Sequence, residues 1–204
     1  MVEAFAEASF NLDFEDINAD FLNFLPQAPA RVLDAGSGVG QNSAALAKKG
    51  FSVVSVEPLH AFLQRAKNQY RGLNITWLND SLPKLEKIDV DSGLFDFVLI
   101  DGVWHHLSIE ERRLCILRLA SIMSVGGVCA ISIRNSPAGA GTHIFSTCIE
   151  ELVDYANEYA FEVILQIENQ PSKMQNKPNV TWSRVALKKT AFERAPNKCQ
   201  QQDC

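Results

Sequence analysis

The feature that most constrains the fold is a glycine-rich turn between an apolar segment and a helical one. Residues 32–40 read Val-Leu-Asp-Ala-Gly-Ser-Gly-Val-Gly. The preceding residues, 31–35, predict a short buried strand, and the small residues of 41–49 predict a helix. Glycines let a backbone turn sharply and approach a ligand closely, and the following helix presents its N-terminus to that ligand. The turn therefore predicts a ligand site at the carboxyl end of the first strand.

Apolar segments alternate with helical patterns along most of the chain. Helices are predicted at 41–49, at 59–69, from a capping box formed by Ser108 and Glu111, and around 145–156. Strands are predicted at 31–35, 51–56, 74–78, 95–100, 128–133, 161–167 and 180–188. This alternation is typical of an α/β sheet with helices on both faces. The last two strands are joined by a polar loop without a helix, which predicts one antiparallel edge strand.

The first 30 residues read as an N-terminal helical segment. Phe14, Ile17, Phe21 and Phe24 recur at helical spacing, with Asp13 placed to cap a helix over 13–25. The Phe-rich stripe suits either the core or a lid over the ligand site. The chain length predicts a single domain over 1–189, followed by a polar, flexible tail over 190–204.

Charge and cysteine content narrow the class of protein. The net charge is −5, and residues 1–30 contain six carboxylates with no Lys, Arg or His, which argues against a nucleic-acid partner. No apolar run reaches the roughly 18 residues of a membrane span, and the start lacks the basic region of a signal peptide. The five cysteines show no CxxC spacing, so a reduced, cytoplasmic setting is expected. Nothing in the sequence decides between a monomer and a homodimer.

Two classes of ligand compete for the turn. A dinucleotide fingerprint needs a third glycine at position 41, where the chain has Gln41. Asp34, two residues before the first glycine, suits a cationic amine better than a pyrophosphate. The pattern Asp-x-Gly-x-Gly-x-Gly resembles the class I S-adenosylmethionine-dependent methyltransferases, and residues 95–107 are similar to the strand 4 motif of small-molecule members. The resemblance implies a Rossmann-like, seven-stranded, mostly parallel sheet in the order 3-2-1-4-5-7-6. It also implies adenosylmethionine as cofactor and adenosylhomocysteine as product.

Further polar residues at strand ends agree with a nucleoside ligand. Glu57 ends the second strand, where an acid can accept hydrogen bonds from both ribose hydroxyls, although a plain surface acid is the alternative. The resemblance implies that Asp80 accepts a hydrogen bond from the adenine amino group and that the Ser81 amide meets the ring. Asp80 also fits an ordinary turn residue. The candidate cofactor-binding residues are Asp34, Gly36, Gly38, Gly40, Glu57, Asp80, Ser81 and Asp101.

The acceptor side is predicted from residues that follow the fourth and fifth strands. His105 is the candidate catalytic residue, as a general base or an acceptor-orienting group, because histidine titrates near neutral pH. Trp104, His106 and Arg134 are candidate substrate-binding residues, with Arg134 placed to pair with a carboxylate or phosphate. The structural alternatives are core packing for Trp104, a hydrogen bond at the start of the helix for His106, and an ordinary ion pair for Arg134. Gly102 stands where related enzymes place an acidic metal ligand, so no metal site is expected.

These features predict methyl transfer by in-line displacement to an oxygen or nitrogen atom of a small molecule. The Asn/Asp-Pro-Pro-Tyr/Phe motif of adenine-type amino methylation is absent after the fourth strand. A methyltransferase acting on RNA or protein, and a catalytically silent binding subunit of the same fold, remain the alternatives. The segments 134–137 and 180–184, Arg-Asn-Ser-Pro and Val-Thr-Trp-Ser-Arg, resemble poorly characterised bacterial members without specifying a substrate.

Overall fold

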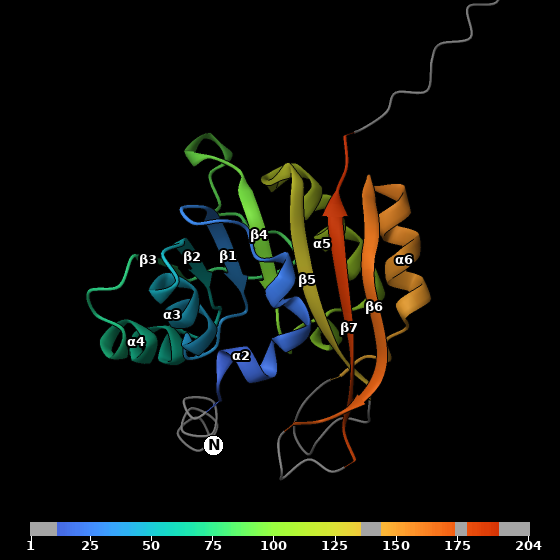
Figure 1. The fold of residues 1–204 in the computed structure, drawn as a ribbon, viewed down its shortest axis with the longest axis horizontal. Helices are drawn as coiled ribbons and strands as arrows, with labels where there is room; N and C mark the ends of the chain where they lie inside the picture. Colours follow the sequence, from blue (N-terminus) through green and yellow to red (C-terminus); the bar gives the residue numbers. More distant parts are fainter. Residues whose placement is uncertain (1–11, 136–143, 174–178, 192–204) are drawn as a thin grey trace, which may run out of the picture.

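A computed structural model describes residues 12–135, 144–173 and 179–191. Its centre is a seven-stranded sheet with the order β3-β2-β1-β4-β5-β7-β6, as predicted (Figure 1). The strands are β1 (Arg31–Ala35), β2 (Ser52–Val56), β3 (Ile75–Leu78), β4 (Phe95–Ile100), β5 (Met123–Asn135), β6 (Phe161–Pro171) and β7 (Thr181–Lys189).

The direction of β7 sets which residues meet at the carboxyl edge of the sheet. β1 pairs in parallel with β2 and β4, and β4 pairs in parallel with β5. β7 runs antiparallel to both β5 and β6, one place in from the edge strand β6. The first residues of β7 therefore lie beside the last residues of β5, with Trp182 opposite Arg134 and Arg184 opposite Ser132.

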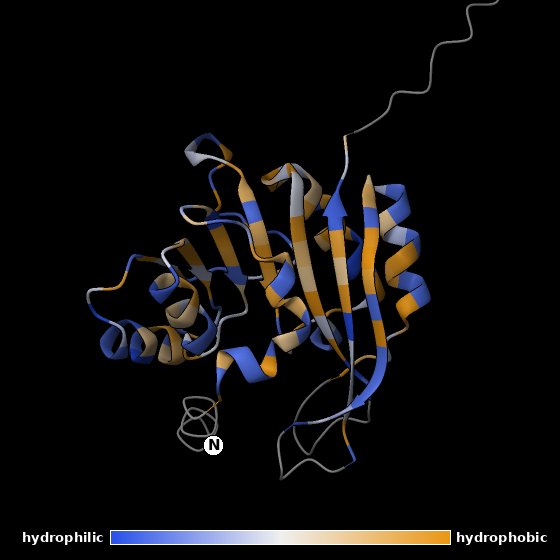
Figure 2. Cartoon of the chain, viewed as in Figure 1, coloured by the Kyte–Doolittle hydropathy of each residue, from blue (hydrophilic) through white to orange (hydrophobic). Residues whose placement is uncertain are grey.

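Helices cover both faces of the sheet, as expected for this class. The helices α5 (Ile109–Ile122) and α6 (Ile149–Glu158) bury residues such as Ile116 and Leu152 against one face. The helix α3 (Gln41–Lys48) and the N-terminal segment bury Leu46, Phe14 and Phe21 against the other. Figure 2 shows hydrophobic residues concentrated along the central strands and a largely hydrophilic α4 (His60–Gln69).

The N-terminal segment is not the single helix that its spacing predicts. It divides into α2 (Phe14–Ile17) and a 3-10 helix, η1 (Ala19–Phe24), at Asn18, whose φ and ψ are −106° and 21°. Asn18 is buried, and its Nδ2 donates to Asn42 Oδ1 of α3 at 3.4 Å. Phe14 and Phe21 belong to the core. A contact between residues distant in the sequence therefore overrides the local helical pattern.

Other boundaries differ by a few residues. β5 begins at Met123 rather than at 128, and α6 begins at Ile149 rather than near 145. Short 3-10 helices, η2 (Val90–Ser92) and η3 (Trp104–His106), flank β4. Within the described ranges, none of the helices is long and apolar enough to cross a membrane. Most of the segment predicted as a tail, 190–204, lies outside the described residues.

Candidate functional site

The glycine-rich turn lies between the end of β1 and the start of α3. The N–H groups of Gly36 and Ser37 both donate to the Val56 carbonyl oxygen, at 2.8 and 2.9 Å, which ties the turn to β2. Gly36 has a φ of +83°, and a Cβ there would lie 2.4 Å from Val103 Cγ2. Gly40 has a φ of +82°, and a Cβ there would lie 2.6 Å from the Trp77 ring. Only glycine fits either position, so the turn keeps its bare backbone at the edge of the sheet.

Glu57 directly follows the neighbouring strand β2 and binds the backbone of the glycine turn. Its side chain is buried, with Oε2 accepting from the Gly38 N–H at 2.9 Å and Oε1 accepting from the Leu59 N–H at 2.8 Å. Burial raises the pKa of this carboxyl, and the two backbone donors oppose that rise. Each oxygen keeps a lone pair beyond these bonds, which leaves acceptor capacity for a ligand hydroxyl.

Asp34 does not reach the surface of the turn. Its carboxyl is buried, and Oδ2 lies 2.6 Å from Ser43 Oγ, which lies 3.0 Å from Ser55 Oγ. Ser55 Oγ is in turn 2.7 Å from Ser37 Oγ, inside the glycine turn. Burial raises the pKa of Asp34 to about 7, against the hydrogen bond from Ser43. The carboxyl therefore connects to the turn through a chain of serine hydroxyls and is not presented to a ligand directly.

Asp80 and Ser81 lie in the loop after β3. Asp80 Oδ1 accepts from the Ser81 N–H at 2.8 Å, and Oδ2 accepts from the Lys87 N–H at 2.7 Å. The Asn79 side chain donates to the carbonyl oxygens of Glu57 and Pro58, at 3.0 and 2.8 Å. This loop is thus fixed to the end of β2, which brings Asp80 to the same edge as Glu57.

Asp101, which follows β4, is the centre of a polar cluster. One oxygen accepts from the Ser132 hydroxyl, and the other accepts from Asn42 Nδ2 at 3.3 Å. Arg184 Nη1 lies 3.6 Å from Asp101 Oδ1. The Gly102 N–H donates to Ser132 Oγ at 2.8 Å, which holds the chain as it leaves β4. The cluster joins α3, β4, β5 and β7 at the carboxyl edge of β1 and β4.

The residues of η3 that were predicted to bind the acceptor take different positions in the structure. Trp104 is fully buried in the core, as in the core-packing alternative to its predicted acceptor contact. His105 is buried, with its ring 4.3 Å from the His106 ring and edge-on to Trp182 at 5.9 Å. His106 is exposed. His105 therefore lies beside Trp182 at the edge of the sheet, with the His106 ring against it.

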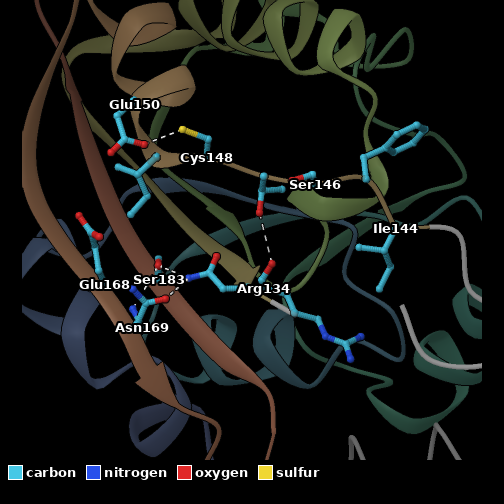
Figure 3. A pocket seen from close by; sticks show the side chains of 12 residues that line it. Arg134, Ile144, Ser146, Cys148, Glu150, Glu168, Asn169 and Ser183 are labelled. Carbon is cyan, nitrogen blue, oxygen red and sulfur yellow. Dashed lines mark hydrogen bonds between the residues drawn. The ribbon is translucent and has the colours of Figure 1, made fainter. Parts of the chain in front are cut away.

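Arg134 lines a cavity of about 590 Å³ between the end of β5 and the start of α6 (Figure 3). The segment before α6 forms one wall and is fixed at several points. The Phe145 N–H donates to the His105 carbonyl oxygen at 2.9 Å, and Thr147 Oγ1 donates to that of Arg134 at 3.3 Å. Asn169 and Ser183 lie on the opposite side (Figure 3). The volume falls within the range of sites for small molecules.

A family model described as a methyltransferase domain matches residues 32–127. The matched region runs from β1 into β5, so it includes the glycine turn, Glu57, Asp80 and Asp101. This part of the chain, from β1 into β5, is therefore similar to methyltransferases. This agrees with the resemblance found in the sequence.

The curated relatives agree with the similarity to methyltransferases. An uncharacterized methyltransferase of Mycobacterium tuberculosis is 30% identical over 114 residues, covering 56% of this chain and 55% of that protein. The chain thus spans about half the length of the curated relatives it matches.

Two solved structures show the same fold over most of the chain. The magnesium protoporphyrin IX methyltransferase of Synechocystis, solved with bound adenosylmethionine, has a TM-score of 0.67 and 17% identity. The 1,6-didemethyltoxoflavin-N1-methyltransferase of Burkholderia thailandensis, solved with its acceptor and adenosylhomocysteine, has a TM-score of 0.67 and 19% identity. Each match covers 91% of this chain and 80% of the other. At these identities the likeness is one of fold.

The sequence-based prediction missed Trp182 and Arg184 as residues of the site. Both lie in the motif of the last strand, and the antiparallel direction of β7 was the signal that could have placed them at the carboxyl edge. In the part of the chain that the structure describes, no three or more His, Cys, Asp or Glu side chains are grouped to hold a metal ion.

Proposed function

We propose that this methyltransferase transfers a methyl group from adenosylmethionine to an oxygen or nitrogen atom of a small-molecule acceptor. The observation that carries the proposal is the hydrogen bond from the Gly38 N–H to Glu57 Oε2 at 2.9 Å. It fixes an acid against a glycine turn between a strand and a helix, the arrangement with which folds of this class hold a nucleoside. His105 follows the neighbouring strand β4 and supplies an acceptor-side group at the same edge.

The residues present fit the cofactor. Gly36 and Gly40 have no room for a Cβ, so the backbone of the turn is available for close approach. Glu57 would accept from the ribose hydroxyls with the lone pairs left by its two backbone bonds. Asp80 would accept from the adenine amino group with a lone pair left by its own bonds, while the Ser81 amide, which donates to Asp80 Oδ1, holds that carboxyl beside the ring. Asp101 would lie at the methionine end. Asp34 would act on Ser37 through the serine chain.

The chemistry required of the protein is modest. When bound, the cofactor supplies an electrophilic methyl group on a cationic sulfur. The protein orients the acceptor atom in line with that methyl group and excludes water. His105 takes the proton that the acceptor loses as its new bond to carbon forms, and Arg134 and His106 orient an anionic group of the acceptor. The buried position of His105 beside Trp182 shields this proton transfer from bulk water.

The acceptor class is tested with adenosylmethionine labelled in its methyl group. The purified protein is incubated with a cell extract divided into small-molecule, RNA and protein fractions, with boiled enzyme as the control. We expect label in the small-molecule fraction, because the cavity beside Arg134 has the volume of a small-ligand site and the acidic N-terminal segment repels phosphate chains. Label found only in RNA or protein would contradict the proposal, and no label in any fraction would favour a silent binding subunit.

The role of His105 is tested by His105→Gln. We expect kcat to fall by about 10²-fold to 10⁴-fold, the usual contribution of a general base. The affinity for adenosylhomocysteine should stay within about twofold, because the proposed cofactor contacts lie elsewhere. His60→Gln, on the exposed surface of α4, is the matched control. A kcat that His105→Gln leaves unchanged would remove His105 from the reaction.

A further inference from the structure

Two buried polar atoms beside Asp101 have no hydrogen-bond partner among the described residues. They are Asn18 Oδ1, from the N-terminal segment, and Arg184 Nη1, from β7. Asn18 is 1% exposed and Arg184 is 7% exposed. A buried polar atom without a partner is costly, and native proteins keep few of them. One is an acceptor and the other a donor, which suggests a ligand that carries both kinds of group.

The orientation of Asn18 follows from Asp101. A carboxylate accepts hydrogen bonds and does not donate, so the Asn42 side chain must turn its Nδ2 toward Asp101, as observed at 3.3 Å. Asn42 Oδ1 then faces Asn18, which must donate through its own Nδ2, at 3.4 Å. The charge of Asp101 thus fixes the direction of both amides, and the Asn18 oxygen is left as an acceptor without a donor.

Arg184 is held by the same N-terminal segment. Its Nη2 donates to the Ile17 carbonyl oxygen at 3.2 Å, and its guanidinium lies 5.8 Å from the Phe21 ring centre. Its Nη1 is 3.6 Å from Asp101 Oδ1, which allows an ion pair but leaves the N–H groups of Nη1 without a hydrogen bond. Arg184 thus presents a fixed cation and a free donor next to Asp101.

The α-amino acid end of the cofactor is complementary to this pair, because it has a donating ammonium group and an accepting carboxylate. We propose that Asn18 Oδ1 accepts a hydrogen bond from that ammonium group and that Arg184 Nη1 donates to that carboxylate. Asp101, at the end of β4, contacts Arg184 directly and Asn18 through Asn42, and it adds a negative charge for the ammonium group. The inference rests on the cofactor site assigned under the proposed function.

This arrangement gives the N-terminal segment a role in binding. Asn18 and Ile17 belong to the segment, so the cofactor would join it to β7 and β4 when bound. Both unpartnered atoms are shielded from solvent in the described arrangement. Residues 13–24 must therefore shift to admit the ligand and then close over its amino acid end.

The test compares two ligands by titration calorimetry. Adenosylhomocysteine carries the amino acid end, whereas methylthioadenosine has the same adenine, ribose and thioether without it. In Asn18→Leu and Arg184→Met we expect the affinity for adenosylhomocysteine to fall at least about tenfold, while that for methylthioadenosine stays within about twofold. Arg113→Met removes an exposed arginine paired with Glu158 and should change neither affinity. Glu57→Gln, at the ribose end, should lower both.

The outcomes separate this inference from the cofactor assignment itself. If both ligands weaken equally in the two variants, Asn18 and Arg184 only support the fold and the inference is overturned. If the folded wild-type protein binds neither ligand, whether or not it binds NADH, the cofactor site under the proposed function is wrong.

A third ligand, decarboxylated adenosylhomocysteine, tests the inference on the wild-type protein. The wild-type protein should bind it at least about tenfold more weakly than adenosylhomocysteine, because a charge-assisted hydrogen bond is lost. Arg184→Met should weaken its binding by less than about twofold, since the carboxylate partner is already gone, while Asn18→Leu should still weaken it. Equal wild-type affinity for the two ligands would overturn the role of Arg184 even if the variants do not fold.

Discussion

Gly36→Ala is expected to destabilise the folded protein by about 2 to 5 kcal/mol and to abolish binding of adenosylhomocysteine. The backbone at Gly36 has a φ of +83°, which costs a residue with a Cβ about 1 to 2 kcal/mol. The new Cβ would also lie 2.4 Å from Val103 Cγ2 and 3.3 Å from both Val103 Cβ and Cγ1. Rotation of the valine would move Cγ2 but leave its Cβ at 3.3 Å, and overpacking of this kind costs about 1 to 3 kcal/mol more.

Urea unfolding of Gly36→Ala beside two companion variants separates the backbone cost from the clash. Gly72 has a φ of +85°, and a Cβ there would meet nothing within 4 Å, so Gly72→Ala should cost about 1 to 2 kcal/mol only. Val103→Ala removes both Cγ atoms, so combining it with Gly36→Ala should recover part of the lost free energy of unfolding. The two substitutions should therefore show a coupling energy opposite in sign to their single effects. If Gly36→Ala and Gly72→Ala lower the free energy of unfolding by the same amount, the Val103 side chain moves aside without cost.

The parts of the fold that could be predicted are those with local signals. The bounds predicted for β1 and β4 match the structure, and the buried runs end at Gly36 and Asp101 respectively. Ser108 and Glu111 form the predicted capping box at the start of α5, because its two hydrogen bonds join residues three apart. The strand order followed from the family resemblance carried by the glycine turn, and the sheet confirms it.

The parts that could not be predicted depend on contacts between distant residues. Arg184 donates to Ile17 across 167 positions, and Asn18 turns out of a helical pattern to meet Asn42. Trp104 and His105 are neighbours in the chain, yet only the 3-10 turn after β4 decides that the indole enters the core while the imidazole meets Trp182. Sequence spacing carries no record of these directions.

Asp34→Asn is expected to stabilise the protein increasingly as the pH rises from about 4 to 7, reaching about 4 kcal/mol above pH 7. The pKa of the buried Asp34 carboxyl is raised from 3.8 in its ordinary environment to about 7 in the folded protein, chiefly by burial. Between these values the folded state keeps a proton that the unfolded state has released. Folding stability therefore falls as the pH rises through this window, and it stops falling once Asp34 ionises in the folded state as well.

The measurement is urea unfolding of the wild-type protein and of Asp34→Asn at several pH values from 4 to 8. At each pH the free energies of unfolding of the two proteins are compared. Asparagine keeps an oxygen that can accept from Ser43, so the serine chain to Ser37 is preserved while the charge is removed. Asp154→Asn, on the exposed face of α6, is the matched control for the loss of one negative charge. A difference that stays constant with pH would mean that Asp34 ionises alike in the folded and unfolded chains. A difference that grows toward pH 7 would show that the fold retains a carboxyl whose ionisation is costly, beneath the turn that we assign to a cationic cofactor.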